Sequence, residues 1–302
     1  MKILIIGGSG SIGSYFVREL LKQNHNLIYT YYKNKTNSTN AVYLDIQDRT
    51  STIKIIEKTN PELIIICNAL TGVDLCEENP SLTNSINVKG TQNIVDGCNL
   101  INCKIVFIST SAVFDGTKNE YFENDIPNPT SVYGMSKLQG ELIIKNSNLP
   151  FLILRTDQPF CWKEKWQHNN SVIRVIENLE KNQTFDEITD WCNTPTYVPD
   201  FIKASLKLIE NKSQGIFHLV GSDYLDRFSW AEKTAKIFNL KKELIKPVHS
   251  SKLKLLVERK NIHLNNDKLF QKIQHRMIGV DEGLQEMFDI SNNKIHKTNL
   301  NT

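Results

Sequence analysis

The chain has 302 residues, and its 36 Lys and Arg side chains outnumber its 33 Asp and Glu side chains by only three. The apolar share of 40% and the charged share of 23% are ordinary for a soluble globular protein. The basic residues are scattered, which excludes nucleic acid and anionic membranes as expected partners. The length allows one elaborated α/β domain, or a large domain and a smaller one.

Cysteine usage and hydropathy indicate a cytoplasmic protein. The six cysteines form no C-x-x-C pair, so we expect free thiols, with neither a disulfide framework nor a metal site. The first apolar run is short and ends in glycine, unlike a signal peptide. No apolar run approaches the ~20 residues that cross a bilayer.

The first predicted element is a strand over Lys2–Ile6 that opens into glycines at 7, 10 and 13. This spacing is typical of the phosphate-binding turn of a dinucleotide-binding fold. The amphipathic helix that follows would direct its free N–H groups and its positive dipole end at the phosphates. A glycine-rich turn without a ligand is the alternative. The residues predicted to bind cofactor here are Gly7, Gly10, Ser11, Ile12 and Gly13.

The second predicted strand, Asn26–Tyr31, bears on the choice of cofactor. NAD-binding folds usually end this strand with an acidic residue that binds the adenosine ribose. Here no acid is present, and Lys33 and Lys35 follow instead. A basic tip suits a 2′-phosphate, so we expect NADP(H) rather than NAD(H). The alternative is that both lysines only solvate a loop.

A third strand is predicted over Ala41–Leu44 and is followed by Asp45 and Ile46. We expect both residues to contact the cofactor, with Asp45 at the adenine edge. An isolated loop aspartate also commonly caps a turn, which is the alternative.

Apolar runs of strand length alternate with helical patterns as far as residue 156. The remaining predicted strands in this part are Leu63–Cys67, Lys104–Ser109 and Phe151–Arg155, and the helices include Thr50–Thr59, Leu82–Asn99 and Ser136–Asn146. The alternation predicts a Rossmann-like, doubly wound parallel sheet with helices on both faces. Asn68 and Ala69 follow the fourth strand and are predicted to contact the cofactor.

The fifth strand ends in hydroxyl side chains, Ser109, Thr110 and Ser111. Ligands bind at the carboxyl ends of parallel strands, so Thr110 could hydrogen-bond a reacting carbonyl. A turn cap is the alternative for Thr110 considered alone.

Tyr133 and Lys137 begin a helical segment, where positions i and i+4 share a face. A lysine ammonium beside the phenol stabilises phenolate and lowers a pKa that starts near ~10. A tyrosine of this kind can exchange a proton with a substrate oxygen near neutral pH. The same spacing recurs at Tyr29 and Tyr31, but on a strand, where i and i+4 lie far apart.

Beyond residue 156 the strand–helix alternation breaks. A loop-rich segment precedes a helix at Ser171–Lys181, a strand returns near 215–220, and a helix at Ser229–Asn239 follows. We expect a cofactor domain over 1–156 that includes the returning strand, and a substrate-binding region over 157–200 and 221–290. Residues 291–302 lack periodicity and are expected to form a flexible tail.

The glycine turn, the hydroxyl-ended strand and Tyr-x3-Lys, in this order, resemble the extended short-chain dehydrogenase/reductase family. Further segments resemble its dTDP-4-dehydrorhamnose reductase branch over nearly the whole chain. These are Val73–Pro80, Ile86–Thr91, Ser109–Gly116, Tyr121–Pro127, Tyr133–Glu141, Ile153–Thr156 and Thr194–Thr196.

The resemblance implies NAD(P)H-dependent reduction of the 4-keto group of a nucleotide-activated 6-deoxyhexose. It implies that Thr110, Tyr133 and Lys137 are catalytic, and that Lys137 also holds the nicotinamide ribose. Asn87 matches a helix asparagine that supports the active site in such enzymes. The residues implied to contact substrate are Thr110, Ser111 and Gln158. A homodimer is among the assemblies that the resemblance allows.

Two departures from the branch bear on the substrate. Asp157-Gln158 stands where the branch commonly has Ser-Trp, whose tryptophan lines the sugar pocket. The segment Arg259–Leu264 lacks the branch's proline, which leaves dTDP and UDP both open as the nucleotide carrier. A sugar-nucleotide epimerase or dehydratase remains an alternative. A non-catalytic NADP-binding subunit, resembling the regulatory subunit of methionine adenosyltransferase, is another.

Overall fold

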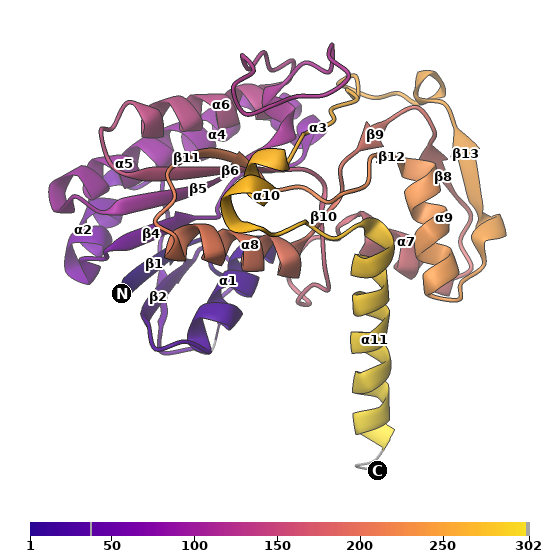
Figure 1. Cartoon of the computed structure of the whole chain (residues 1–302), viewed down its shortest axis with the longest axis horizontal. Helices are drawn as coiled ribbons and strands as arrows, with labels where there is room; N and C mark the ends of the chain where they lie inside the picture. The colour runs from indigo at the N-terminus through magenta and orange to yellow at the C-terminus, as the bar shows by residue number, and fades with distance from the viewer. Residues whose placement is uncertain (37, 300–302) are drawn as a thin grey trace.

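The computed structural model describes residues 1–36 and 38–299, with side chains of the last helix described as far as Asn293. Its centre is a seven-stranded, fully parallel sheet (Figure 1). The strands of this sheet are β1 (Lys2–Ile6), β2 (Asn26–Tyr31), β3 (Ala41–Tyr43), β4 (Leu63–Ile66), β5 (Lys104–Thr110), β6 (Phe151–Thr156) and β11 (Gly215–His218). The predicted Rossmann-like fold is confirmed.

The strand order is β11-β6-β5-β4-β1-β2-β3. The chain therefore runs outward from β1 on one side and then from β4 on the other. Ligands of such sheets bind where the order reverses, beyond the carboxyl ends of the strands. Here that point lies between β1 and β4, so the glycine turn after Ile6 and the loop after Ile66 come together.

Helices cover both faces of the sheet and bury two separate apolar layers. On one face, α1 (Ser11–Leu21), α8 (Val198–Glu210) and α10 (Asp267–Ile273) contribute side chains such as Phe16 and Phe201. On the other face lie α2 (Arg49–Thr59), α5 (Gly90–Ile101) and α6 (Val132–Lys145). Strands buried on both sides explain the nearly continuous apolar runs, such as the fully buried Leu63–Ile66.

The helix predicted over Leu82–Asn99 is present, but it is not one regular helix. After the short α3 (Val73–Glu78), the chain forms α4 (Pro80–Thr83), a π-helical turn η1 (Asn84–Lys89) and then α5. Apolar periodicity does not distinguish a π-helical turn from an α-helix. The wider turn carries Asn87, and such turns occur frequently at functional sites.

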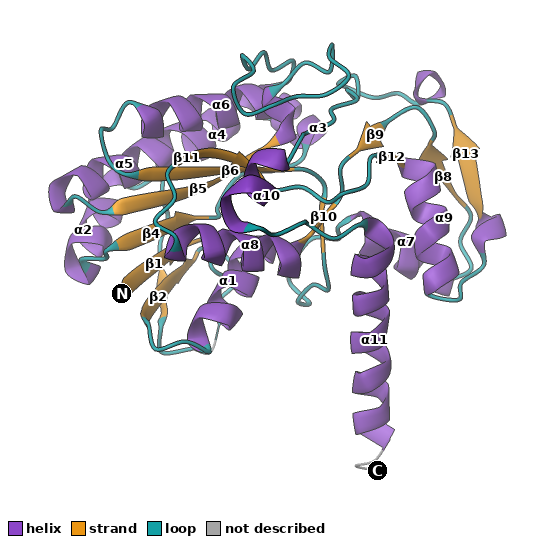
Figure 2. Ribbon diagram, viewed as in Figure 1, coloured by secondary structure: helices purple, strands orange, loops and turns teal. Residues whose placement is uncertain are grey.

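After β6 the chain also forms a second group of elements beside the sheet, apart from β11, α8 and α10, which belong to the sheet and its cover (Figure 2). It contains three two-stranded pairs, β7–β10, β9–β12 and β8–β13. Their bounds, with the helices and turns not yet given, are β7 (Pro159–Phe160), α7 (Ser171–Glu180), β8 (Phe185–Ile188), β9 (Cys192–Asn193), β10 (Thr196–Tyr197), β12 (Leu225–Asp226), α9 (Arg227–Ile237), β13 (Ile245–Val248), α11 (Val280–Asn299), η2 (Ser111–Val113), η3 (Lys242–Leu244) and η4 (Ser250–Lys252). Aromatic side chains, including Phe160, Tyr197 and Trp230, pack with α7 and α11 in its core.

The flexible tail predicted over residues 291–302 overlaps the last helix. Helix α11 continues through Asn299, and residues 300–302 lie outside the described residues. The sequence of this segment has no amphipathic period, so the sequence pattern did not indicate a helix.

Candidate active site

The glycine turn has the geometry that the sequence predicted. Gly7 adopts a left-handed φ of 81°, and the N–H of Gly10 donates to the carbonyl of Gly7 at 3.0 Å. A Cβ on Gly13 would lie 2.9 Å from the Cα of Gly8, so only glycine lets α1 pack this close to the turn. The side chain of Thr30 supports the turn from β2, since its Oγ1 accepts from the N–H of Gly7 at 3.0 Å.

The start of α1 offers free donors to an anionic ligand. Gly10 is the N-cap and supplies no side-chain cap. Within the described residues, no acceptor contacts the N–H groups of Ser11 and Ile12. Beside the turn, both polar side-chain atoms of Asn68 are buried without a partner, and its backbone N would lie 2.9 Å from a Cβ on Gly7. These features fit the phosphates and amide of a nicotinamide dinucleotide.

The residues expected near the adenosine end lie at the tips of β2 and β3. Lys33 and Lys35 are exposed, and neither forms an ion pair in the part of the chain that is described. Asp45 is half-buried and its Oδ1 accepts from the N–H of Gln47 at 2.9 Å, as a turn-capping aspartate does. Ile46 is buried and packs on Gly90, where a Cβ would meet its side chain.

Helix α6 begins close to the end of β5, and two of its glycines, Gly134 and Gly140, make this close approach possible. The Ser131 hydroxyl caps the helix by accepting from the N–H of Gly134 at 3.1 Å. A Cβ on Gly134 would lie 3.0 Å from the carbonyl carbon of Ala112 and closer still to its oxygen. Further along, a Cβ on Gly140 would meet the Phe107 ring at 2.8 Å. Both glycines allow the helix that carries Tyr133 to lie against β5 and η2.

A buried amide links this helix to the loop after β4. The Oδ1 of Asn87 accepts from the N–H of Leu70 at 2.8 Å, and its Nδ2 contacts Leu70 O at 3.0 Å. The same Nδ2 donates to Ser136 Oγ at 2.9 Å, and Ser136 Oγ donates to Tyr133 O at 2.7 Å. Asn87 therefore connects the residues beside the glycine turn with the backbone of Tyr133.

A buried ion pair fixes the far end of α6. Glu141 and Arg155 are each 1% exposed and make two hydrogen bonds, at 2.9 and 2.7 Å. Ser109 Oγ donates to Glu141 at 2.6 Å. On its other side, Arg155 lies 3.5 Å from His218 Nε2, and His218 Nδ1 lies 3.0 Å from Asn265 O. The geometry implies a neutral histidine that donates through Nδ1 and accepts through Nε2.

Tyr133 and Lys137 come from one face of α6, as predicted, but the pKa of the phenol is not lowered in the chain by itself. Desolvation raises the pKa of Tyr133 to about 12, and hydrogen bonding with Thr110 only partly opposes this. Burial lowers the pKa of Lys137 to about 8, opposed by the charge of Glu141. The Lys137 ammonium lies 3.9 Å from the centre of the Phe107 ring. The raised pKa keeps the phenol protonated at neutral pH.

Thr110 and Ser111 lie at the carboxyl end of β5, next to this helix. Thr110 is 8% exposed, and its Oγ1 accepts from Ala112 N at 3.2 Å, so it does cap η2, and its hydroxyl also hydrogen-bonds with Tyr133. Ser111, predicted to contact substrate, donates instead to Asp157 Oδ1 at 2.8 Å. The other oxygen of Asp157 accepts from the N–H of Thr194 at 2.8 Å. Burial raises the pKa of Asp157.

Gln158 and Arg227 extend the site toward α9. Gln158 has a left-handed φ of 38°, a strained conformation for a side-chain-bearing residue, and its Oε1 accepts from Arg227 Nη1 at 2.9 Å. The Arg227 guanidinium lies 5.1 Å from the centres of both the Trp191 and the Trp230 rings. Burial lowers the pKa of Arg227 to about 10. No sequence pattern indicated Arg227, which lies 69 residues from Gln158.

Other kinds of site find no support. Among the side chains that the structure describes, those of residues 1–36 and 38–293, His, Cys, Asp and Glu form no group that could hold a metal ion. All six cysteines are free thiols. None of the described helices has the length and hydropathy of a membrane span.

Solved structures with this fold include sugar-nucleotide enzymes. A dTDP-4-dehydrorhamnose reductase from Bacillus anthracis str. Ames, in complex with NADP, has a TM-score of 0.86 and 27% identity, and the match covers 95% of this chain and 99% of that one. A UDP-glucose 4-epimerase from Thermus thermophilus, complexed with NAD, has a TM-score of 0.84 and 19% identity over 96% and 98%. At that identity the second match shows the fold alone.

Relatives by sequence include reductases and subunits of another enzyme. The dTDP-4-dehydrorhamnose reductase of Aggregatibacter actinomycetemcomitans is 30% identical over 246 residues, which are 79% of this chain and 78% of the relative. Methionine adenosyltransferase 2 subunit beta of Rattus norvegicus is 26% identical over 274 residues, covering 89% and 81%. The family model described as the RmlD substrate binding domain matches residues 1–292. The chain thus belongs to the RmlD substrate-binding domain family, whose dTDP-4-dehydrorhamnose reductases it resembles.

Proposed function

We propose that this protein is an NAD(P)H-dependent reductase of the 4-keto group of a nucleotide-activated 6-deoxyhexose. One observation carries the proposal: α6 brings the protonated phenol of Tyr133 beside Thr110, at the carboxyl edge of the sheet that also holds the glycine turn. Membership in the family and the likeness to dTDP-4-dehydrorhamnose reductases support the reaction class.

The bound dinucleotide would supply hydride to the carbonyl carbon. Tyr133 donates its phenolic proton to the carbonyl oxygen, so that the ketone becomes a secondary alcohol. A pKa of about 12 keeps this proton on the phenol until the oxygen gains negative charge. Thr110 orients the same oxygen by hydrogen bonding. The Lys137 ammonium stabilises the phenolate that remains and binds the nicotinamide ribose.

The turn residues Gly7, Gly10, Ser11, Ile12 and Gly13 would hold the pyrophosphate, with Asn68 and Ala69 beside the nicotinamide half. We infer that NADP(H) is preferred, because Lys33 and Lys35 are the exposed charges at the tip of β2. The similar B. anthracis enzyme was solved with NADP and the T. thermophilus epimerase with NAD, so the fold accepts either cofactor.

The substrate would lie between the sheet edge and the elements at 157–200 and 221–290. Gln158 and Arg227 face one another there, and Arg227 has no ion-pair partner among the described side chains. A buried guanidinium of this kind suits an anionic substrate such as a sugar nucleotide. Asp157 lies close enough to Tyr133 to influence its pKa. Gln158 supplies an amide for sugar hydroxyls where the branch has the ring of a tryptophan.

The test is turnover with dTDP- and UDP-linked 4-keto-6-deoxy sugars, in which the oxidation of NADPH and of NADH is followed separately by absorbance. The Tyr133→Phe substitution removes only the proton donor, so we expect kcat to fall by about 10²–10⁴-fold. The affinity for the dinucleotide, measured without sugar, should not change. Near-normal turnover by the variant would end this assignment.

The relatives named as subunits of methionine adenosyltransferase favour a second candidate, a non-catalytic regulatory subunit. Such a protein would bind a dinucleotide, reduce none of the sugars and copurify with a methionine adenosyltransferase. Size-exclusion chromatography of the protein mixed with that enzyme distinguishes the two candidates. Coelution favours the regulatory subunit, and separate elution favours the reductase. A sugar-nucleotide epimerase or dehydratase would instead show no net consumption of NADPH.

A further inference from the structure

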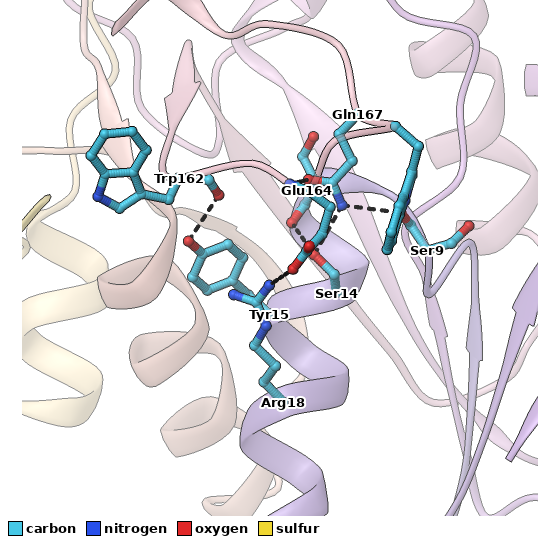
Figure 3. Close-up of polar contacts among 9 residues, drawn as sticks. Ser9, Ser14, Tyr15, Arg18, Trp162, Glu164 and Gln167 are labelled. Atoms are coloured by element: carbon cyan, nitrogen blue, oxygen red, sulfur yellow. Dashed lines mark hydrogen bonds and ion pairs between the residues drawn. The ribbon is translucent and has the colours of Figure 1, made fainter. Parts of the chain in front are cut away.

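A loop segment from the second part of the chain lies directly against the glycine turn. Residues 162–167, here called the strap, connect β7 to α7 and pass beside the start of α1 (Figure 3). Trp166 Nε1 donates to the carbonyl of Ser9 at 3.1 Å, and Gln167 Nε2 donates to the same carbonyl at 3.0 Å. Two side chains from beyond the sheet therefore hold one peptide group of the turn.

The Gln167 amide is fixed at both of its ends. The residue is buried, at 8% exposure, and its Oε1 accepts from the N–H of Glu164 at 3.0 Å. Its Nε2 also lies 3.2 Å from Ser14 Oγ in the first turn of α1. Every polar atom of this side chain is thus used, either to shape the strap or to hold the turn.

Two further contacts attach the strap along α1, and a third attaches it to the last helix. Tyr15 OH donates to the carbonyl of Trp162 at 3.0 Å, and Arg18 pairs with Glu164 (Figure 3). The indole of Trp162 donates to the carbonyl of Met287 in α11 at 2.8 Å. The strap therefore joins the glycine turn to the helices of the second part.

The position of Ser9 explains what this contact does. Its carbonyl and the N–H of Gly10 belong to one planar peptide unit, so fixing one orients the other. The N–H of Gly10 donates within the turn to Gly7 O at 3.0 Å, while the carbonyl accepts from the strap. The unit that precedes the free N–H groups of Ser11 and Ile12 is therefore held from both sides. Glycine-rich segments lose much conformational freedom on ordering, and holding them in the bound conformation strengthens binding.

We propose that Gln167, assisted by Trp166, is a positioning residue for the dinucleotide phosphates. It touches no substrate, and it acts by holding the Ser9–Gly10 peptide so that the N–H groups of α1 point at the pyrophosphate. The affinity for the dinucleotide is then set partly by the strap, which leads into the proposed substrate-binding elements. This inference rests on the proposed dinucleotide site, but not on the identity of the sugar.

The test measures the dissociation constant for NADPH by fluorescence or calorimetry, without sugar and without turnover. Gln167→Met keeps the side-chain length and removes its hydrogen bonds to the turn, so we expect binding to weaken by about tenfold. Trp166→Phe removes a single donor at a half-exposed position and should weaken binding by about threefold. Asn169→Ala is the matched control and should leave binding unchanged, since the Asn169 side chain bonds Glu177 in α7 and no other described residue.

A purely structural role would lower the unfolding temperature and leave NADPH affinity intact in the folded variant. Unchanged affinity in both Gln167→Met and Trp166→Phe overturns the inference while the proposed function stands. Should Gln167→Met fail to fold, Trp166→Phe alone decides, because Trp166 is about half exposed and its substitution removes no buried core side chain. If the unaltered protein binds no dinucleotide, the proposed function fails and this inference fails with it. At saturating NADPH, kcat should remain within about twofold, because Gln167 contacts neither Tyr133 nor Lys137.

Discussion

Gly134→Ala should move Tyr133, the proposed proton donor, away from Thr110, which we propose orients the substrate. Gly134 lies one residue after Tyr133, and its Cα faces the carbonyl of Ala112, two residues after Thr110. An added Cβ would lie less than 3.0 Å from the carbonyl oxygen of Ala112, which is closer than real Cβ atoms approach other atoms. This oxygen belongs to the backbone, so it cannot rotate away as a side chain could. Ordinary contact begins at 3.4 Å, so the start of α6 must move from η2 by about 1 Å.

A displacement of this size between reacting groups costs about 100-fold in rate, so we expect kcat to fall by about that factor. The glycine turn is built from other elements, so NADPH affinity should change by less than about twofold. Stopped-flow and steady-state oxidation of NADPH would measure the rate, and titration without sugar would measure binding.

Gly140→Ala is the matched control on the same helix. Its Cβ would meet only the edge of the Phe107 ring at 2.8 Å, two turns beyond Tyr133. We expect it to lower the unfolding temperature and to leave kcat within about threefold. Wild-type kcat in folded Gly134→Ala, or an equal loss in both variants, would refute the idea that the approach of α6 to η2 sets the geometry of catalysis.

Three further predictions concern stability and cofactor choice. Glu141→Gln leaves the buried Arg155 charge without its partner and should lower the free energy of unfolding by about 3–5 kcal/mol in denaturant titrations, and a change below 1 kcal/mol would contradict this. Burial lowers the pKa of His218 from 6.5 to about 3, so only the unfolded chain takes up its proton between these values. Stability should therefore fall as pH drops below 6.5, by up to ~1.4 kcal/mol per pH unit from this group, and His218→Gln should show a shallower slope than the unaltered protein. Lys33→Glu should weaken NADPH binding about tenfold relative to NADH, and an unchanged ratio of the two dissociation constants would argue against NADP preference.

The central sheet could be predicted because its inner strands, such as β4 and β5, are buried on both faces. Continuous apolar runs such as Leu63–Ile66 stand out from the amphipathic helices between them, and glycines at fixed spacing mark the turn after β1. The position of the candidate site residues could be predicted in the same way, since the carboxyl ends of parallel strands meet at one edge of the sheet.

Other features depend on contacts between distant segments and could not be read from local pattern. Gln167 and Ser9 are 158 residues apart, and Arg227 and Gln158 are 69 apart. The sequence also led us to expect a lowered pKa for Tyr133, whereas burial raises it in the chain without ligands. The i, i+4 spacing places an amine on the same face, but it does not report how strongly the surrounding protein desolvates the phenol.

The late position of β11 in the chain has a consequence for biosynthesis. Residues Gly215–His218 pair with Leu152–Arg155, so the edge of the sheet beside β6 stays open until some sixty further residues have been synthesised. An open parallel edge invites pairing with other chains. Release of the nascent polypeptide before residue 218 should therefore yield an aggregating fragment, and residues 1–156 alone should not fold as a separate unit.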